Sequence, residues 1–527
     1  MEKVNLLDCT LRDGGYINNW EFGESTIKGV INKLGQTGIE MIEVGFIKGT
    51  VYDSNKSLFP DTDSFINVLN YKEPGVKYVG MVDMSAPVDF DCIRPYRSDS
   101  IDGIRVIFKK NKLYEGFEFC KMAIQKGYMV FANFVSIDAY SDKEFIDAIE
   151  MFNGIRPSGI TLVDTFGMLK RRDFRRLLSI ADNNMAEGIM LCYHGHNNLQ
   201  QALSNAETMV EMNFKRDIVI DACVFGMGRG AGNLNLELFA EYLNDVCDKN
   251  YKIEPMLEVM DEYLSVFYNT KFWGYSLPLY LTASLGYHPN YGIYLAEKNT
   301  LPVKAFNELL LSIPEENKYV FSKEIAEQYY RAYFKNYVDD SHDLNRLAAE
   351  IAHKKVVVVA PGKTVRSNKE KILNATMVDD TITITINFYD REIAPDYIFL
   401  SNMKRLQSLQ EIDNTKLVVT SNIAKDVKSE YVINFSSYTG GEKEIFDNAG
   451  LMSIRFLKKL GVKTVYLAGM DGYTDKYGDN FYDSKFEPTH LSVADNRNEM
   501  IRGSLEELSR DIKIIFITPS LYEMKYN

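Results

Sequence analysis

The sequence predicts an α/β protein with a (β/α)8 TIM barrel, a helical extension and a second, Rossmann-like α/β domain. Eight short apolar runs alternate with helical segments over about 240 residues of the first half, close to the usual barrel size of roughly 250 residues. A helical, aromatic stretch follows, and strand-like runs then return. We therefore predict a catalytic barrel at 1–247, a helical extension at 248–350 and a Rossmann-like domain at 351–527.

The barrel is predicted from the order of its elements. The expected strands are residues 4–10, 41–46, 77–83, 103–108, 129–136, 159–165, 190–196 and 218–225. Segments between them, such as 25–37 and 199–212, repeat apolar residues at helical spacing. A doubly wound open sheet could use the same alternation. The polar residues that end most of these strands favour the barrel, because the active sites of such barrels lie at the carboxyl ends of the strands.

The second half divides into a helical and an alternating part. Residues 248–343 are helical in pattern and rich in aromatic side chains. The strands expected after them are residues 355–360, 381–387, 397–401, 416–421, 431–435, 462–468 and 512–518, which alternate with helices such as 449–460. Alternation of this kind is typical of a parallel sheet in a Rossmann-like domain.

Composition excludes several classes of protein. The net charge of -13 and the pI near 5.2 argue against binding to nucleic acid or to anionic membranes, which requires clustered Lys and Arg. The chain opens without the pattern of a secretory signal, and its most apolar later stretch, residues 272–287, is too short to span a bilayer. We therefore expect a cytoplasmic protein. The six cysteines include no CxxC pair, which favours reduced thiols over disulfides or a zinc site.

Two histidines indicate a metal site. His194 and His196 end the seventh expected strand, and residues two apart on a strand point to the same face. Asp13 follows the first strand, a near neighbour of the seventh in a closed barrel, and can add an oxygen ligand. These donors suit Mn²⁺, our first choice, as well as Mg²⁺ or Zn²⁺. The alternative is a pair of histidines that cap a glycine turn.

Three motifs in this order resemble the HMG-CoA-lyase-like, pyruvate-metabolising metal-dependent barrels. They are Asp-Cys-Thr-Leu-Arg-Asp-Gly at 8–14, His-Gly-His-Asn-Asn-Leu at 194–199 and Gly-Met-Gly-Arg-Gly-Ala-Gly-Asn at 226–233. Within that family they are most similar to the 4-hydroxy-2-oxovalerate aldolases. The resemblance covers roughly residues 1–300. It implies that a carbon–carbon bond is made or broken through the enolate of pyruvate or another 2-oxo acid.

The resemblance also implies roles for individual residues. Asp13, His194 and His196 would bind the divalent metal, Asn233 would contribute to its surroundings, and Arg12 would stabilise the enolate. The sequence departs from the family at Tyr16, where the aldolases carry a histidine thought to act as the base.

A phenol, with an ordinary pKa near 10, is a poor base unless the site lowers that pKa. His288 and Tyr275 are the candidates to replace the base from the helical extension, although His288 can equally be a packed loop histidine.

Further polar residues fall at or near expected strand ends. Glu43, Asn133 and Asp164 are candidates for substrate binding, together with Tyr275. For Glu43 and Asp164 the alternative is a structural ion pair with Lys or Arg inside the barrel rim.

The Ala-Pro-Gly-Lys-Thr stretch at 360–364 raises the question of a phosphate site in the second domain. It is not a Walker A motif, because Val357 occupies the position of the required first glycine. A strand followed by a Pro-Gly turn and a helix can still present backbone amides to a phosphate. The domain weakly resembles the Rossmann-like fold of some bacterial sialyltransferase-like proteins, which implies nucleotide or nucleotide-sugar binding. A plain turn is the alternative.

Our first hypothesis is thus a metal-dependent aldolase or lyase that acts on a small 2-oxo acid and an aldehyde or acyl acceptor. The second is an acetyl-CoA-dependent condensing enzyme of the isopropylmalate or homocitrate synthase type, which needs a CoA pocket. The third is a catalytically altered barrel fused to a nucleotide-sugar-binding domain. A homodimer is expected by resemblance, and no nucleic-acid or membrane partner is expected.

Overall fold

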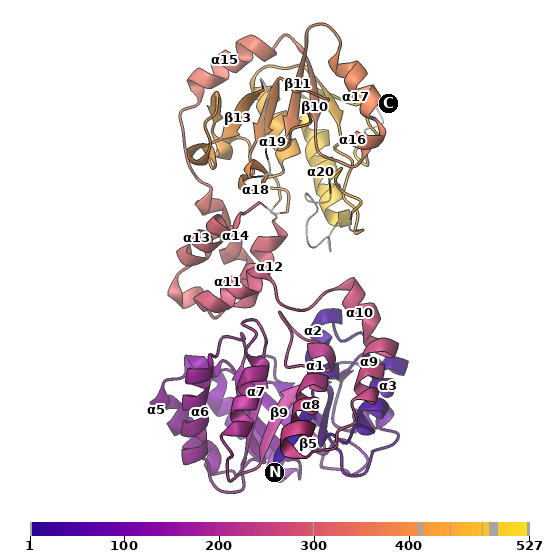
Figure 1. Cartoon of the computed structure of the whole chain (residues 1–527), viewed down its shortest axis with the longest axis vertical. Coiled ribbons are helices and arrows are strands. Elements are labelled where there is room, and N and C mark those ends of the chain that lie inside the picture. The colour runs from indigo at the N-terminus through magenta and orange to yellow at the C-terminus, as the bar shows by residue number, and fades with distance from the viewer. Residues whose placement is uncertain are drawn as a thin grey trace. The chain divides into compact units, whose positions relative to one another are not determined.

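A computed structural model describes residues 3–523 except 299, 408, 410–414, 443, 477 and 484–493. The chain divides into two compact units, residues 1–289 and 290–527. Each unit is built around its own parallel sheet (Figure 1). The limits of the three predicted domains stay predictions.

The first unit contains the predicted closed barrel of eight parallel strands, which is confirmed. Its strands are β1 (Val4–Asp8), β2 (Met41–Ile47), β4 (Lys77–Asp83), β5 (Gly103–Phe108), β6 (Met129–Phe134), β7 (Gly159–Asp164), β8 (Met190–Gly195) and β9 (Ile218–Ala222). Neighbours in the chain pair in this order, and β1 pairs with both β2 and β9, which closes the ring. A two-residue strand, β3 (Leu58–Phe59), adds to β2 outside the ring.

Helices surround the barrel. They are α1 (Thr10–Asp13), α2 (Gly15–Asn18), α3 (Glu24–Gly35), α4 (Leu113–Gln125), α5 (Asp142–Asn153), α6 (Arg171–Asn184), α7 (Ala202–Glu211) and α8 (Leu236–Cys247). Their buried faces join the outward side chains of the strands in one large apolar core. After β2 and β4 the described chain forms only short 3-10 helices where an α-helix would complete the regular alternation.

Residues 248–350 are helical, as their pattern indicates, and their described part contains no strand. The helices are α9 (Glu254–Val259), α10 (Ser265–Thr270), α11 (Leu277–Leu285), α12 (Pro289–Glu297), α13 (Val303–Ser312), α14 (Lys323–Tyr333) and α15 (Ser341–Ile351). Helices α9–α11 belong to the first unit and α13–α15 to the second.

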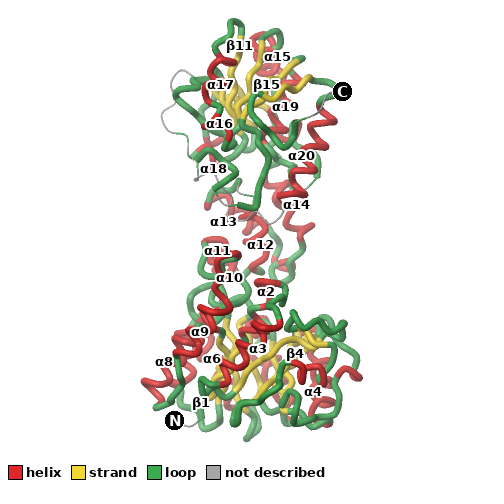
Figure 2. Tube along the Cα trace, turned by 90° about the vertical axis from the view of Figure 1, so that its right-hand side faces the viewer, coloured by secondary structure: helices red, strands yellow, loops and turns green. Residues whose placement is uncertain are grey.

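The second unit contains the second predicted parallel sheet. Its strands are β10 (Lys355–Val359), β11 (Thr381–Ile386), β12 (Tyr397–Leu400), β13 (Lys416–Thr420), β14 (Tyr431–Ile433), β15 (Thr464–Ala468) and β16 (Lys513–Phe516). Across the sheet their order is β14-β13-β12-β11-β10-β15-β16. The helices between them are α16 (Thr364–Ser367), α17 (Lys369–Thr376), α18 (Met403–Leu406), α19 (Ala449–Lys459) and α20 (Ala494–Leu508) (Figure 2).

The direction in which successive strands are added to this sheet reverses once. From β10 the chain moves outward strand by strand to β14, and after α19 it returns to form β15 on the other side of β10. Two apolar clusters, one around Val357 and Val359 and one around Ile398 and Leu400, lie on the same face of this sheet, because Val359 pairs with Thr385 and Thr385 pairs with Ile398. Among the described residues, no helix has both the length and the apolar character needed to cross a membrane.

Candidate metal centre and active site

The inward side chains of the barrel change from apolar to polar along the strands. One apolar cluster consists of Leu7, Cys9, Met41, Val79, Phe131, Cys192, Val219 and Cys223. Two residues further along four of these strands, and therefore on the same face, are Glu43, Asn133, His194 and Asp221. All four are buried. The carboxyl end of the barrel thus places polar side chains next to an apolar layer.

A short turn after β1 delivers Arg12 and Asp13 to this end. Asp8 accepts hydrogen bonds from the Thr10 amide at 3.0 Å and from the Thr10 hydroxyl at 2.6 Å, which starts the single turn of α1. Gly15 permits the chain to fold back, because a Cβ there would lie 2.0 Å from the indole ring of Trp20. The Trp20 indole in turn donates to the Arg12 carbonyl at 2.8 Å.

The predicted metal ligands converge. Asp13, His194 and His196 each offer a donor atom, and these atoms lie within 4.8 Å of one another. All three residues are at least nine-tenths buried. Asn233 donates to the Asp13 carboxylate at 2.5 Å, and a β-bridge links it to His196.

Two buried atoms at this place lack hydrogen bonds in the described structure: Nδ1 of His196 and Oδ1 of Asn233. A buried polar atom without a partner is costly, and a bound cation would satisfy both. Two imidazoles, a carboxylate and an amide oxygen form a donor set that fits a divalent ion such as Mn²⁺, Mg²⁺ or Zn²⁺.

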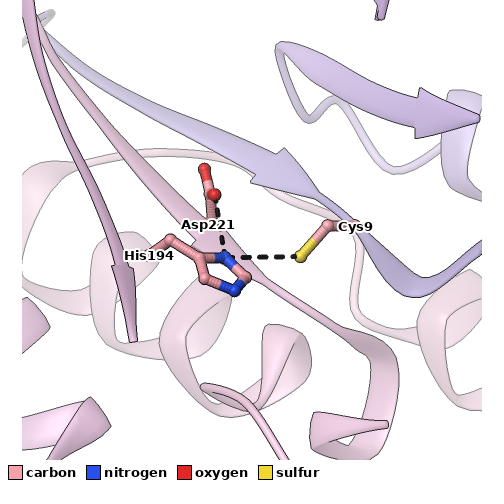
Figure 3. Close-up of side chains that lie close together, drawn as sticks. All are labelled: Cys9, His194 and Asp221. Atoms are coloured by element: carbon pink, nitrogen blue, oxygen red, sulfur yellow. Dashed lines mark hydrogen bonds and ion pairs between the residues drawn. The ribbon is translucent and has the colours of Figure 1, made fainter. Parts of the chain in front are cut away.

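Asp221 fixes the orientation of His194. Its Oδ2 lies 2.9 Å from Nδ1 of His194 (Figure 3). A carboxylate next to Nδ1 retains the proton on that nitrogen and leaves the lone pair of Nε2 for a metal. Burial alone would raise the pKa of Asp221, but the charge of Arg105 and the His194 hydrogen bond hold it below its usual value.

Cys9, His194 and Asp221 form a second group with metal-ligating atoms close together. The Cys9 sulfur is 4.0 Å from Nδ1 of His194 and 3.2 Å from the sulfur of Cys223. Burial raises the pKa of the Cys9 thiol well above its ordinary value, and Cys223 adds to the effect. A protonated thiol is a poor ligand, and Asp221 is already engaged. Asp13, His194 and His196 are therefore the better metal-binding group.

A chain of buried ion pairs connects the site. Arg12 donates from Nε to Glu43 at 2.6 Å and from Nη1 to Asp13 at 2.5 Å. Arg105, deeper in the barrel, donates to Glu43 at 3.2 Å and also to Asp221. Arg12 and Arg105 thus hold three carboxylates in one buried network.

The charges around Asp13 keep it ionised. Burial would raise its pKa, but the neighbouring Arg12 and the two imidazoles hold the pKa well below its ordinary value. Asp13 is therefore a carboxylate at neutral pH and is ready to bind a metal. His196 is neutral there, because burial lowers its pKa to about 4.

Tyr16 and His288 both contact Arg229. The guanidinium of Arg229 is 5.8 Å from the ring centre of Tyr16 and donates to Nε2 of His288 at 3.0 Å. Burial and the Asp13 charge raise the pKa of Tyr16, and burial and Arg229 lower the pKa of His288 to about 3. Tyr16 therefore keeps its proton, and His288 is a weak proton acceptor.

The predicted substrate-binding residues take different positions. Glu43 lies between Arg12 and Arg105. Asn133 accepts a hydrogen bond from Thr161 at 2.9 Å inside the barrel. Asp164 holds the loop after β7, because its two oxygens accept from the amides of residues 168 and 169. Tyr275 is 54% exposed, and its ring contact among the described residues is with Tyr280.

Sequence reasoning missed Arg105, Asp221 and Arg229 as site residues. A signal for the first two was present, since each is a charged residue within an otherwise apolar predicted strand. Their pairing depends on closure of the barrel, which brings β5 and β9 across from each other. Arg229 belongs to the glycine-rich motif at 226–233, but only the glycines and Asn233 of that motif were interpreted.

Sequence comparisons find a family model and curated proteins that part of this chain resembles. Residues 117–261 match the HMGL-like family model, and the matched segment contains His194, His196, Asp221 and Asn233. A 4-hydroxy-2-oxovalerate aldolase of Desulfitobacterium hafniense is 25% identical over 292 residues, which cover 50% of this chain and 78% of the relative. An oxaloacetate decarboxylase of Mycobacterium tuberculosis is 25% identical over 237 residues, which cover 44% and 67%.

Among solved structures, the HMG-CoA lyase of Bacillus subtilis aligns with a TM-score of 0.41 at 18% identity. The alignment covers 51% of this chain and 94% of that structure.

Asp221→Asn is expected to weaken metal binding because an amide cannot hold the Nδ1 proton of His194 as a carboxylate does. The affinity for Mn²⁺, measured by isothermal titration calorimetry, should fall about 10- to 100-fold. Asp217→Asn is the matched control, since Asp217 is exposed on the same segment. An unchanged affinity in a folded Asp221→Asn protein would contradict the assigned orientation of His194.

The low pKa of His196 predicts a pH-dependent stability of metal-free protein. The folded imidazole titrates at about 4, whereas an unfolded one titrates near 6.5. The folded state therefore binds this proton less readily. The contribution of His196 to the free energy of unfolding is complete above about pH 6.5 and is lost as the pH falls through 4.

Other buried groups titrate in the same range, including Asp164, whose pKa is raised to about 7 by burial. The effect is therefore measured as a difference between the wild type and His196→Gln, by urea unfolding in EDTA at several pH values. The wild type should lose stability relative to the variant as the pH drops from about 6.5 to 4. A constant difference would refute the assignment.

Proposed function

We propose that this chain, which carries an HMGL-like barrel, is a divalent-metal-dependent carbon–carbon lyase that acts on a 2-oxo acid. One observation carries the proposal: the donor atoms of Asp13, His194 and His196 lie within 4.8 Å of one another at the carboxyl end of the barrel, beside Arg12. The names of the relatives, an aldolase and a decarboxylase, both describe cleavage of a carbon–carbon bond in a 2-oxo acid.

The residues of the site have separate roles in the reaction. A bound divalent cation would act as a Lewis acid on the oxygen atoms of the 2-oxo acid. Arg12 supplies a fixed positive charge for the oxygen that becomes negative when the carbon–carbon bond breaks. Its ion pairs with Glu43 and Asp13 hold it in position, so little reorganisation is needed during the reaction.

Proton transfer is the step in which this chain departs from the aldolases. Tyr16 keeps its proton, and its hydroxyl has no hydrogen-bond partner among the described residues. We assign it as the donor that protonates the carbon of the enolate or its oxygen. His288 is a poor base because Arg229 occupies its Nε2.

Decarboxylation of a 2-oxo diacid is the second candidate reaction. An aldol cleavage must remove a proton from the substrate hydroxyl, which needs a base, whereas loss of carbon dioxide needs none. The raised pKa of Tyr16 and the engaged lone pair of His288 therefore favour decarboxylation. Both reactions form an enolate, which Arg12 stabilises and Tyr16 protonates.

Several finer features belong to the proposal as well. Mn²⁺ is our first choice of metal, and the acceptor of the aldol reaction is an aldehyde. We also propose a homodimer and a cytoplasmic location. A condensing reaction with acetyl-CoA remains the alternative, and addition of CoA donors to the assay tests it.

The function is tested by release of pyruvate from 4-hydroxy-2-oxovalerate and from oxaloacetate in the presence of Mn²⁺, with the metal-only rate subtracted. Arg12→Lys should lower kcat/KM about 10²- to 10³-fold, as loss of a donor to a developing oxyanion does elsewhere. Arg97→Lys is the control, because Arg97 is an exposed residue paired with Asp99. No pyruvate from either compound would refute the proposal.

Tyr16→Phe should separate proton transfer from metal binding. The variant keeps the ring contact with Trp20 at 4.9 Å but loses the hydroxyl. We expect turnover of the better substrate to fall about 10²-fold or more, with an unchanged Mn²⁺ affinity. Tyr71→Phe, at an exposed site, serves as the control. Full turnover in Tyr16→Phe would show that another group delivers the proton.

A further inference from the structure

The second unit has a cavity of its own at the carboxyl ends of its strands. It measures about 190 Å³, and all its lining residues lie between 297 and 522. The lining includes residues that directly follow β10, β11, β12 and β15. Strands β10 and β15 are the neighbours at which the strand order reverses. In open parallel sheets, ligands bind in the crevice at this reversal.

Glycines make the base of the cavity narrow and rich in backbone groups. The amide of Gly362 donates to the carbonyl of Gly469 at 2.8 Å, which ties the turn after β10 to the turn after β15. Gly469 has a φ of +67°, and a Cβ on it would lie 2.0 Å from the Ala360 carbonyl oxygen. The two turns thus expose main chain, which a ligand can approach closely.

Two arginines line the cavity, each next to an aromatic ring. Arg405 is 8% exposed and lies 5.4 Å from the ring centre of Phe481. Arg497, in α20, lies 5.2 Å from the ring centre of Tyr473. The Nε atom of Arg497 is buried without a hydrogen-bond partner in the described part of the chain. Rings that already contact guanidinium groups help to fix these cations.

Helix α19 adds a third source of positive potential. Asn448 caps it by accepting from the Leu451 amide at 3.0 Å, and Ala449 and Gly450, which line the cavity, begin the helix. The first amides of a helix have no partner inside it and attract anions. The cavity therefore combines two guanidinium groups with a helix start.

Among the described residues, four acidic ones line the cavity, Glu297, Glu444, Asp447 and Asp471, and three of them have the following partners. Asp471 accepts from the Thr364 amide at 2.7 Å, Asp447 accepts from the Tyr330 hydroxyl, and Glu444 pairs with Lys323 at 3.3 Å. Each partner uses only part of the acceptor capacity of a carboxylate. The carboxylates can therefore accept hydrogen bonds from hydroxyl groups of a ligand whose anionic end faces the arginines.

We propose that this cavity binds a phosphate ester of a polyhydroxylated small molecule, with the phosphate on Arg405, Arg497 and the start of α19. Phosphate matches the planar guanidinium fork and the helix amides, and hydroxyl groups match the carboxylates. A free sugar phosphate and a nucleotide both have this chemistry. The proposal does not depend on the activity of the barrel.

The test is isothermal titration calorimetry on the full chain in EDTA, which removes metal from the barrel. The probes are ribose 5-phosphate, uridine 5′-monophosphate and ribose. At least one phosphorylated probe should bind, and ribose should bind at least about tenfold more weakly. The tighter of the two phosphorylated probes distinguishes a sugar-phosphate site from a nucleotide site.

Variants locate the binding. Arg497→Gln should lower the affinity for the probe that binds at least about tenfold. Arg497→Lys, which keeps the charge, should lower this affinity less. Arg510→Gln, at an exposed position after α20, should bind as the wild type does. Binding by neither phosphorylated probe, or full binding in Arg497→Gln, would overturn the proposal.

Discussion

The barrel depends on a chain of ion pairs buried in its interior. Arg12, Glu43, Arg105 and Asp221 come from α1, β2, β5 and β9, and each of the four is less than 5% exposed. Removal of such charges from water is expensive, and well-packed apolar side chains would often be at least as stable. Loss of one partner costs more, because the others remain buried and unpaired. The network therefore links α1 to the strands β2, β5 and β9.

The same network prepares the site for its chemistry. Asp221 connects Arg105 with His194, and Glu43 connects Arg105 with Arg12, so the orientations of the proposed metal ligand His194 and of the proposed anion-stabilising Arg12 share one support. Groups that are fixed before the reaction need no reorganisation when charge develops. Stability and reactivity are thus set by the same few side chains.

Local patterns in the sequence were sufficient for the strands and for bringing together the two histidines of the proposed metal site. Alternation along a strand puts His194 and His196 on one face without knowledge of the rest of the molecule. By contrast, the raised pKa of Tyr16 arises chiefly from burial, and the engagement of His288 arises from Arg229, which is distant from it in the sequence. The partners of Arg105 are equally remote. Such features are properties of closure and desolvation, which periodicity does not reveal.

The two candidate sites of the chain follow from one geometric rule. In a parallel sheet all strands end on the same side, so their following loops and helix starts gather there. A closed barrel has no reversal of strand order, and its inward side chains, such as His194 and Asp221, meet on the axis. An open sheet has no such axis, and its loops separate only where the order reverses, between β10 and β15. That difference explains why the first site combines inward strand side chains with the turns that follow them, whereas the second is built from glycine turns, a helix start and arginines.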